Sequence, residues 1–368
     1  MPGMAKYLVV EREKVRSNIK KVRQRAGSAT VYGVLKGNAY GFGLLEMADM
    51  LRDEGISHFA ITEPRDLVIL RNSGFVDEEV LVMRSTSIPE EIEKIIEYNG
   101  VATIGSYDAA VAINGIAEKN ATNAEAHIEI DTGMGRYGFL PGESDKVISV
   151  FKYLSSLNIT GMYTHFYKAF SSGKTTKTQF NEFMRAVEAV RQAGFDPGTL
   201  HAANSSALLK YPYTVLDAVR VGSALTGRVA AKGNFGLSKT GYAESNIVEI
   251  RWLQKNQTVG YGGDYVCRKG TRIAVVPLGY ADGFCAEKQR DQYTFHSTSL
   301  VCLSALKAWL TGKRLTVSVN GRPARVLGHV GMQHTVIDVT DLDCAIGDAV
   351  RFDVNPILAG AMIPKKYV

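Results

Sequence analysis

TVYGVLKGNAYGFG, residues 30–43, decides the fold that we expect for this chain. A short run rich in β-branched and aromatic residues leads to Lys36, and a turn rich in glycine follows it. The next segment, LLEMADMLRDEG (44–55), has apolar residues at helical spacing. The stretch is therefore a strand, a turn and a helix, which is the repeating unit of an α/β fold.

The same unit recurs along residues 30–225. The further β-rich runs, each separated from the next by a turn or a helical pattern, are HFAITE (58–63), EVLVMR (79–84), VATIGS (101–106), AHIEID (126–131), TGMYTHF (160–166), TLHAAN (199–204) and AVRVGSAL (218–225). Strands that alternate with helices in this number are typical of a (β/α)8 barrel. A doubly wound open sheet is the alternative, and the strand count makes it the weaker one.

The pattern changes after residue 225. TGRVAAKGNFGLSKTG (226–241) is rich in glycine and indicates a linker, and short alternating strands follow it. We therefore predict an α/β protein: a (β/α)8 TIM-type barrel over residues 8–235, followed by a mostly β C-terminal domain over 236–368 that residues 1–7 join.

Two stretches of the predicted β domain stand out. VSVNGRPARV carries Asn320-Gly321 between two strand patterns, which is a strong signal for a two-residue hairpin. Residues 285–313 have no assignable place, although SLVCLSALKAWL (299–310) within them is compatible with one helix.

Composition excludes several classes of protein. The 368 residues are 45% hydrophobic and 22% charged, which is ordinary for a globular chain. The net charge of +6 is spread without a basic run, and no apolar stretch is long enough to span a bilayer, so we expect neither a nucleic-acid nor a membrane partner. The four cysteines form no C-x-x-C pair, so no metal is expected, and a cytoplasmic protein with reduced thiols is the default.

Gly133, Gly135 and Gly138 match the G-x-G-x-x-G pattern of dinucleotide-binding folds. They follow the fifth strand of the series rather than the first, so an ordinary turn with an embedded arginine is the better interpretation.

Reactive side chains gather where the barrel strands end, which is where barrel enzymes place their active sites. They are Lys36, Arg136, His165, Asn204, Ser205 and Arg220. Apolar Val34 and Leu35 precede Lys36, and such surroundings can lower an amine's pKa and make it a nucleophile. A solvated charge at the barrel rim is the alternative for Lys36, and a core histidine is the alternative for His165.

These residues lie in stretches that resemble bacterial alanine racemases, which are pyridoxal-phosphate enzymes built from a barrel and a β domain. The similar stretches, in family order, are VLKGNAYGFG (34–43), IDTGMGRYGF (130–139), YTHF (163–166), HAANSS (201–206), VRVGSALTGR (219–228), VGYGGDY (259–265) and PLGYADGF (277–284). They extend over almost the whole chain.

The resemblance implies a two-base racemisation with pyridoxal 5′-phosphate as the cofactor. Lys36 would hold the cofactor covalently and act as the base on one face of the substrate. Tyr261 would be the base on the other face, contributed by the second subunit of a homodimer; a half-buried strand aromatic is its alternative interpretation. Arg220 would face the pyridine nitrogen, and His165 would sit behind Arg220 and Tyr261 and set the tyrosine's acidity.

The resemblance also implies binding residues. Those expected at the cofactor, several of them at its phosphate, are Tyr40, Asn204, Ser205, Gly222 and Ser223. Those expected at the substrate are Arg136, Tyr280 and Met332.

The chain departs from the family pattern at three places. Gly331-Met332-Gln333-His334 stands where an acidic group usually follows the methionine, and Glu129 stands where many members carry a carboxylated lysine. We expect Glu129 to supply that anion directly and to pair with Arg136 in a two-point contact. Ala361 aligns with a tyrosine of the family, which suggests room for a substrate side chain larger than that of alanine, such as serine or a longer or basic amino acid.

Two alternative functions remain open at this point. A pyridoxal-phosphate carrier without turnover would need neither the β domain nor Tyr261. A decarboxylase of similar two-domain fold would need a cysteine and an acidic pair, which residues 331–334 lack.

Overall fold

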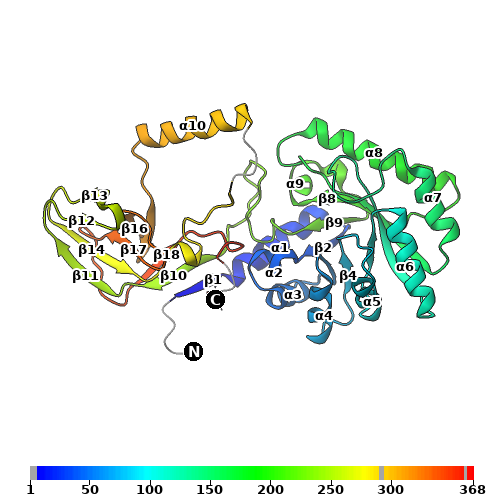
Figure 1. Ribbon diagram of the computed structural model, residues 1–368, viewed down its shortest axis with the longest axis horizontal. Helices are drawn as coiled ribbons and strands as arrows, with labels where there is room; N and C mark the ends of the chain where they lie inside the picture. The colour runs from blue at the N-terminus through cyan, green and yellow to red at the C-terminus, as the bar shows by residue number, and fades with distance from the viewer. Residues whose placement is uncertain (1–5, 290–293, 360–362) are drawn as a thin grey trace. The chain divides into compact units, whose positions relative to one another are not determined.

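The structure is a computed structural model that describes residues 6–289, 294–359 and 363–368 (Figure 1). The chain divides into two compact units, Arg12–Thr240 and Met1–Glu11 with Gly241–Val368. The first unit is the barrel and the second is a β unit.

The barrel is a sheet of eight parallel strands in the order β4-β3-β2-β9-β8-β7-β6-β5. A parallel bridge between Leu81 and Val101 joins its two ends, so the sheet is nearly closed. Its strands are β2 (Thr30–Val34), β3 (His58–Ile61), β4 (Glu79–Val82), β5 (Ala102–Ile104), β6 (Ala124–Ile130), β7 (Leu157–Thr164), β8 (Thr199–Asn204) and β9 (Ala218–Val221). The predicted barrel fold is confirmed.

Helices follow the strands and cover the barrel from outside (Figure 1). They are α1 (Arg12–Ala26), α2 (Lys36–Tyr40), α3 (Leu44–Asp53), α4 (Pro64–Asn72), α5 (Pro89–Glu97), α6 (Tyr107–Lys119), α7 (Ser144–Tyr153), α8 (Gly173–Gln192) and α9 (Ser205–Lys210), with the 3-10 turn η1 (Pro212–Thr214). In α8, the sequence shows why the helix begins and ends where it does. Its N-cap Ser172 accepts a hydrogen bond from the Thr175 amide, and Gly194 just beyond its end takes a left-handed φ of 89°.

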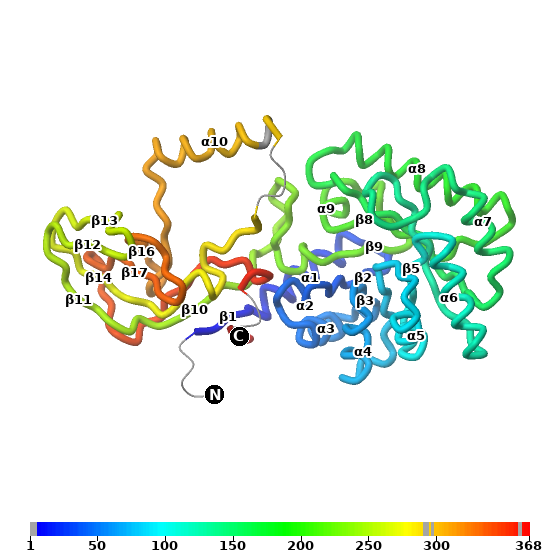
Figure 2. Tube along the Cα trace, viewed as in Figure 1, coloured from blue at the N-terminus to red at the C-terminus, as the bar shows by residue number. Residues whose placement is uncertain are grey.

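The β unit is built on one long sheet in the order β11-β14-β17-β16-β15-β18-β10-β1-β19. The strands of the unit are β1 (Lys6–Val10), β10 (Tyr242–Asn246), β11 (Glu249–Leu253), β12 (Thr258–Val259), β13 (Tyr265–Val266), β14 (Thr271–Val276), β15 (Thr316–Val319), β16 (Arg322–Val326), β17 (Thr335–Asp338), β18 (Ala349–Phe352) and β19 (Lys365–Tyr367). β1 pairs with β19, so segments from the two ends of the chain lie side by side (Figure 2).

The predicted hairpin is confirmed: Val319 pairs with Arg322, and the two residues between them both have positive φ, 48° for Asn320 and 81° for Gly321. Part of the unplaced segment 285–313 forms helix α10 (Phe295–Leu310; Figure 1). The side chains of Phe295 and Trp309 on this helix are largely exposed. Residues 290–293 of that segment and Ala361 lie outside the described residues. In the described part of the chain, no helix has the length and apolarity that crossing a membrane requires.

The segment 226–240 is attached to the barrel and is not the free linker that its glycines suggest. Asn18, fully buried on α1, donates hydrogen bonds to the carbonyls of Leu225 at 3.1 Å and of Ser238 at 2.8 Å. The Asn18 amide oxygen accepts from the backbone N–H of Ser238 at 2.8 Å. One buried side chain thus closes the loop at both ends.

We expect Asn18→Leu to lower the free energy of unfolding by about 3 kcal/mol, because it leaves three backbone groups unsatisfied beside a buried apolar side chain. Urea unfolding followed by circular dichroism measures this. Gln24→Ala, an exposed position on the same helix, is the control and should change stability by less than about 0.5 kcal/mol. Equal effects of the two changes would mean that Asn18 does not hold the loop.

Candidate active site

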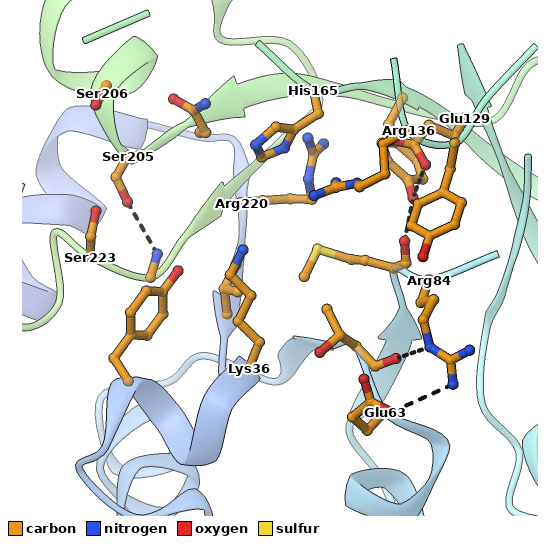
Figure 3. A pocket seen from close by; sticks show the side chains of 18 residues that line it. Lys36, Glu63, Arg84, Glu129, Arg136, His165, Ser205, Ser206, Arg220 and Ser223 are labelled. Atoms are coloured by element: carbon orange, nitrogen blue, oxygen red, sulfur yellow. Dashed lines mark hydrogen bonds and ion pairs between the residues drawn. The ribbon is translucent and has the colours of Figure 1, made fainter. Parts of the chain in front are cut away.

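A cavity of about 390 Å³ opens where the barrel strands end (Figure 3). It brings together the predicted barrel residues Lys36, Tyr40, Arg136, His165, Asn204, Ser205, Arg220, Gly222 and Ser223. Ser205 and Ser223 lie toward one end of the cavity, Glu63 and Arg84 lie toward the other, and Lys36 lies between them (Figure 3).

Lys36 begins a left-handed turn. Gly37, Asn38, Ala39 and Tyr40 all have φ between 51° and 62°, and three of these four residues carry a side chain. L-residues rarely adopt this conformation, which costs on the order of 1 kcal/mol for each of them. The amide oxygen of Asn38 stabilises the turn by accepting from the backbone N–H of Leu44 at 2.9 Å. The turn carries the Tyr40 side chain back to the cavity.

Tyr40, Gly222 and Ser205 form a tight cradle of polar groups. A Cβ atom at Gly222 would lie 2.3 Å from the Tyr40 hydroxyl oxygen, so only glycine allows this approach. The Ser205 hydroxyl accepts from the backbone N–H groups of Gly222 at 3.1 Å and of Ala224 at 3.3 Å. Burial raises the pKa of the Tyr40 phenol to about 12, so this hydroxyl keeps its proton and can donate to an anion.

Arg220 is buried beneath the cavity. Its Nη1 donates to His201 Nδ1 at 2.7 Å and to the His201 carbonyl at 3.0 Å, and its Nη2 donates to the Thr164 carbonyl at 2.6 Å. Its Nε atom is buried and has no partner in the described structure. A permanent cation with one unused buried N–H is suited to binding an acceptor atom of a ligand.

The Lys36 amine has a pKa below its usual value. Burial is the largest cause, and repulsion by the charges of Arg136 and Arg220 adds to it. Burial is also the largest cause for His165, and repulsion by the charges of Arg220, Lys36 and Arg136 adds to it, so the pKa of His165 lies well below its usual value. At neutral pH the cavity therefore holds an amine that is more readily neutral than a free lysine, beside a neutral imidazole.

The predicted two-point contact between Glu129 and Arg136 is wrong in this structure. The carboxylate of Asp131 accepts from the backbone N–H groups of residues 133–135, which folds the turn onto Asp131 and leaves the Arg136 side chain exposed. Glu129 is 2% exposed, and its Oε2 accepts from the Tyr163 hydroxyl at 3.2 Å.

Asn204 lines the cavity, but both ends of its side-chain amide are hydrogen-bonded to the protein backbone. Its oxygen caps α9 by accepting from the Ala207 N–H at 3.1 Å, and its nitrogen donates to the Phe166 carbonyl at 3.0 Å. The last three predicted residues belong to the β unit: Tyr261 in η2 (Tyr261–Gly263), Tyr280 in η3 (Tyr280–Asp282), and Met332. Each is exposed there, Tyr261 most of all at 82%.

Two charged residues of the cavity, Glu63 and Arg84, were not predicted from the sequence. Each stands two residues after the last residue of a barrel strand, as Lys36 does, so the signal was present. Arg84 donates to Glu91 at 2.8 Å and lies 3.5 Å from Glu63.

Both parts of this chain are similar in sequence to known alanine racemases. Residues 10–229 match the family model of the alanine racemase N-terminal domain, and residues 242–355 match that of the C-terminal domain. The alanine racemase of Desulforamulus reducens is 30% identical over 363 residues, 97% of this chain and 90% of the relative. That of Methanococcus maripaludis is 30% identical over 344 residues, 91% of this chain and 85% of the relative. A solved alanine racemase structure from Clostridium difficile 630 superposes with a TM-score of 0.85 at 25% identity, covering all of this chain and 97% of the other.

Glu129 makes stability depend on pH. Burial raises its pKa from 4.5 to about 7, against the opposing pull of Arg220 and Arg136. The unfolded chain therefore releases this proton at lower pH than the folded chain, so ionisation favours unfolding. This contribution to stability is largest below about pH 4.5 and falls by about 3 kcal/mol as the pH rises to about 7.

Glu129→Gln should remove this pH dependence, because the amide keeps an oxygen for the Tyr163 hydroxyl and carries no proton to lose. The unfolding free energy of the variant relative to the original chain should rise by about 3 kcal/mol between pH 4.5 and pH 8. Glu125→Gln, at an exposed position on the same strand, is the matched control and should show no such rise. If the difference in unfolding free energy between Glu129→Gln and the original chain did not change with pH, the pKa of Glu129 would not be raised in the folded chain.

Proposed function

Because the chain belongs to the alanine racemase family and is therefore an amino-acid racemase, we propose that it interconverts L- and D-alanine with pyridoxal 5′-phosphate held in the barrel cavity. The observation that carries this proposal is the position of Lys36 in the cavity, with Ser205 and Ser223 on one side and the buried cation of Arg220 on the other (Figure 3). The active form that we propose is a homodimer.

The cavity suits this cofactor at three points. The hydroxyl groups of Tyr40 and Ser205 in the cradle, and that of the neighbouring Ser223, can donate hydrogen bonds to a phosphate. The unpartnered Nε of Arg220 offers a hydrogen bond to a pyridine nitrogen that carries no proton. The lowered pKa of Lys36 favours the neutral amine, which is the form that attacks an aldehyde.

Pyridoxal phosphate, when bound, supplies an electron sink that makes the substrate's α-proton removable. The residues of the chain then have separate tasks. Arg220 stays charged and keeps its own protons, so it binds the ring nitrogen without protonating it. The Lys36 amine takes a proton from one face of the α-carbon, which its lowered pKa permits at neutral pH.

Racemisation needs a second base on the opposite face, and we propose Tyr261 from the partner subunit. Its exposure of 82% in the β unit supports this, because a tyrosine that served the core of its own unit would be buried. Tyr280 and Met332, also exposed in the β unit, are proposed to border the substrate. Arg136 is proposed to bind the substrate carboxylate, and His165 to act on the acidity of Tyr261.

Two other functions compete with this one. A pyridoxal-phosphate carrier would bind the cofactor and leave the α-hydrogen of amino acids in place, and a decarboxylase would release carbon dioxide. The α-hydrogen decides among them. We expect α-deuterated alanine to lose its label and its optical rotation together, with no carbon dioxide formed.

Tyr261→Phe is the sharpest test of the two-base mechanism, because it removes the phenolic proton and little else. The variant should keep the long-wavelength absorbance of lysine-bound cofactor and exchange the α-proton of only one enantiomer at an appreciable rate. Hydrogen exchange measured separately on L- and D-alanine decides this. Normal racemisation by the variant would overturn the mechanism.

Tyr265→Phe, four residues further along the chain at the start of β13, is the matched control and should racemise normally. Mixing Lys36→Ala chains with Tyr261→Phe chains tests the shared site. Every dimer of one chain of each kind would hold one site with both bases, so part of the activity should return. No recovery would mean that both bases come from one chain.

Alanine is the substrate that we propose first, and Ala361 is the reason to expect larger ones as well. A tyrosine aligned at this position in the family would narrow the site, and alanine lacks that ring. We expect kcat/KM for serine, lysine, arginine or methionine to come within tenfold of that for alanine. Ala361→Tyr should abolish the turnover of the larger amino acids. A preference for alanine above tenfold, about 1.4 kcal/mol, would show that the site is narrow.

A further inference from the structure

Two buried histidines connect Arg220 to the interior of the barrel. Nδ1 of His201 lies 2.7 Å from Nη1 of Arg220, and Nε2 of His201 lies 2.9 Å from Nδ1 of His127. His201 has no exposed surface and His127 is 1% exposed. The His201 ring is stacked between the rings of Tyr32 and Tyr163, at centroid distances of 5.3 and 4.8 Å.

Arg220 determines which ring nitrogens carry the protons in this chain of contacts. A guanidinium only donates hydrogen bonds, so Nδ1 of His201 must accept and carries no proton. The proton of a neutral His201 is then on Nε2 and is donated to Nδ1 of His127. By the same logic, the proton of a neutral His127 is on its own Nε2. One arginine thus determines which nitrogen is protonated in both rings.

Every partner that the structure describes for this guanidinium is neutral: the His201 imidazole and two carbonyl oxygens. The Glu129 carboxyl interacts electrostatically with Arg220, but its described hydrogen bond goes to the Tyr163 hydroxyl and not to the guanidinium. The two imidazoles instead point their lone pairs toward Arg220 in series, and hydrogen bonds in series strengthen one another.

We propose that His127 is a positioning residue: by accepting a hydrogen bond from His201 Nε2, it holds the His201 ring in place and, through that ring, holds Arg220 as a donor toward the cavity. Its contact with the reaction is indirect, through His201 and Arg220, so its link to catalysis rests on the proposed function. The tautomer itself does not depend on that function. The alternative is that His127 only fills space in the barrel core.

The surroundings keep both rings neutral. The titratable groups that face them are Tyr32 from β2, His58 from β3, Tyr163 from β7 and Arg220 from β9. Burial and the Arg220 charge lower the pKa of His127 to about 3 and that of His201 well below its usual value. Gly161 allows the close packing, since a Cβ there would lie 2.7 Å from Nε2 of His127.

Nitrogen-15 spectra of the full chain, labelled at histidine, test the tautomers directly. We expect His127 and His201 to show protonated Nε2 and bare Nδ1 throughout the neutral pH range, with and without added pyridoxal phosphate. Comparison with the variants below assigns the signals. A protonated Nδ1 on His201, or titration of either ring near neutral pH, would overturn the proposal.

Two substitutions of His127 separate positioning from packing. His127→Asn keeps an acceptor oxygen near the place of Nδ1, whereas His127→Leu keeps bulk and removes the acceptor. We expect His127→Leu to weaken cofactor binding, measured by absorbance titration, by on the order of tenfold, and to shift the nitrogen-15 signal of His201 Nε2, because that N–H loses its acceptor. His127→Asn should restore most of both. His58→Asn, beside the same Tyr32 ring but outside the chain of contacts, should change neither.

Equal effects of His127→Asn and His127→Leu would overturn the proposal, because packing alone would then explain them. If His127→Leu does not fold, the spectrum of the original chain and the His127→Asn variant still decide. A chain that bound no pyridoxal phosphate at all would refute the proposed function and leave the tautomer result standing on its own.

Discussion

Burial of the Arg220 guanidinium is the constraint on which the barrel interior depends. A cation taken from water needs partners for its protons, and this one has two carbonyls, an imidazole and the face of the Tyr163 ring at 4.6 Å. Each partner comes from a strand next to or near β9, so the closed sheet is what assembles them. Burial lowers the pKa of Lys36, His165 and His201, and the same charge adds to this effect.

The second constraint is the left-handed turn after Lys36. Its strain lies beside the reactive amine, which is where strained backbone tends to serve function. The turn ends the strand at the amine and returns Tyr40 to the place where Gly222 leaves room for its ring. The local conformation of one loop therefore connects the amine and the phosphate cradle that we propose, and neither could shift without the other.

The two units contribute different kinds of group. The barrel provides buried charges with shifted pKa values, while Tyr261, Tyr280 and Met332 are exposed in the β unit. A buried charge can be tuned by its surroundings, and an exposed side chain stays available to a second chain. In our proposal each active site combines the two, so catalysis and dimer formation are the same requirement.

The sequence by itself determined the eight barrel strands and the Asn320-Gly321 hairpin, because strand periodicity and turn chemistry are local properties. From strand ends it also predicted a group of neighbouring residues that do line one cavity: Lys36, Arg136, His165, Asn204, Ser205 and Arg220. It also placed Lys36 next to a glycine-rich turn. Only the tertiary structure decided which of these side chains contact one another. Glu129 meets Tyr163 and not Arg136, and His201 meets both Arg220 and His127, because these contacts join strands far apart in the chain. Residue types predict which chemistry is available, and strand register alone decides which groups touch.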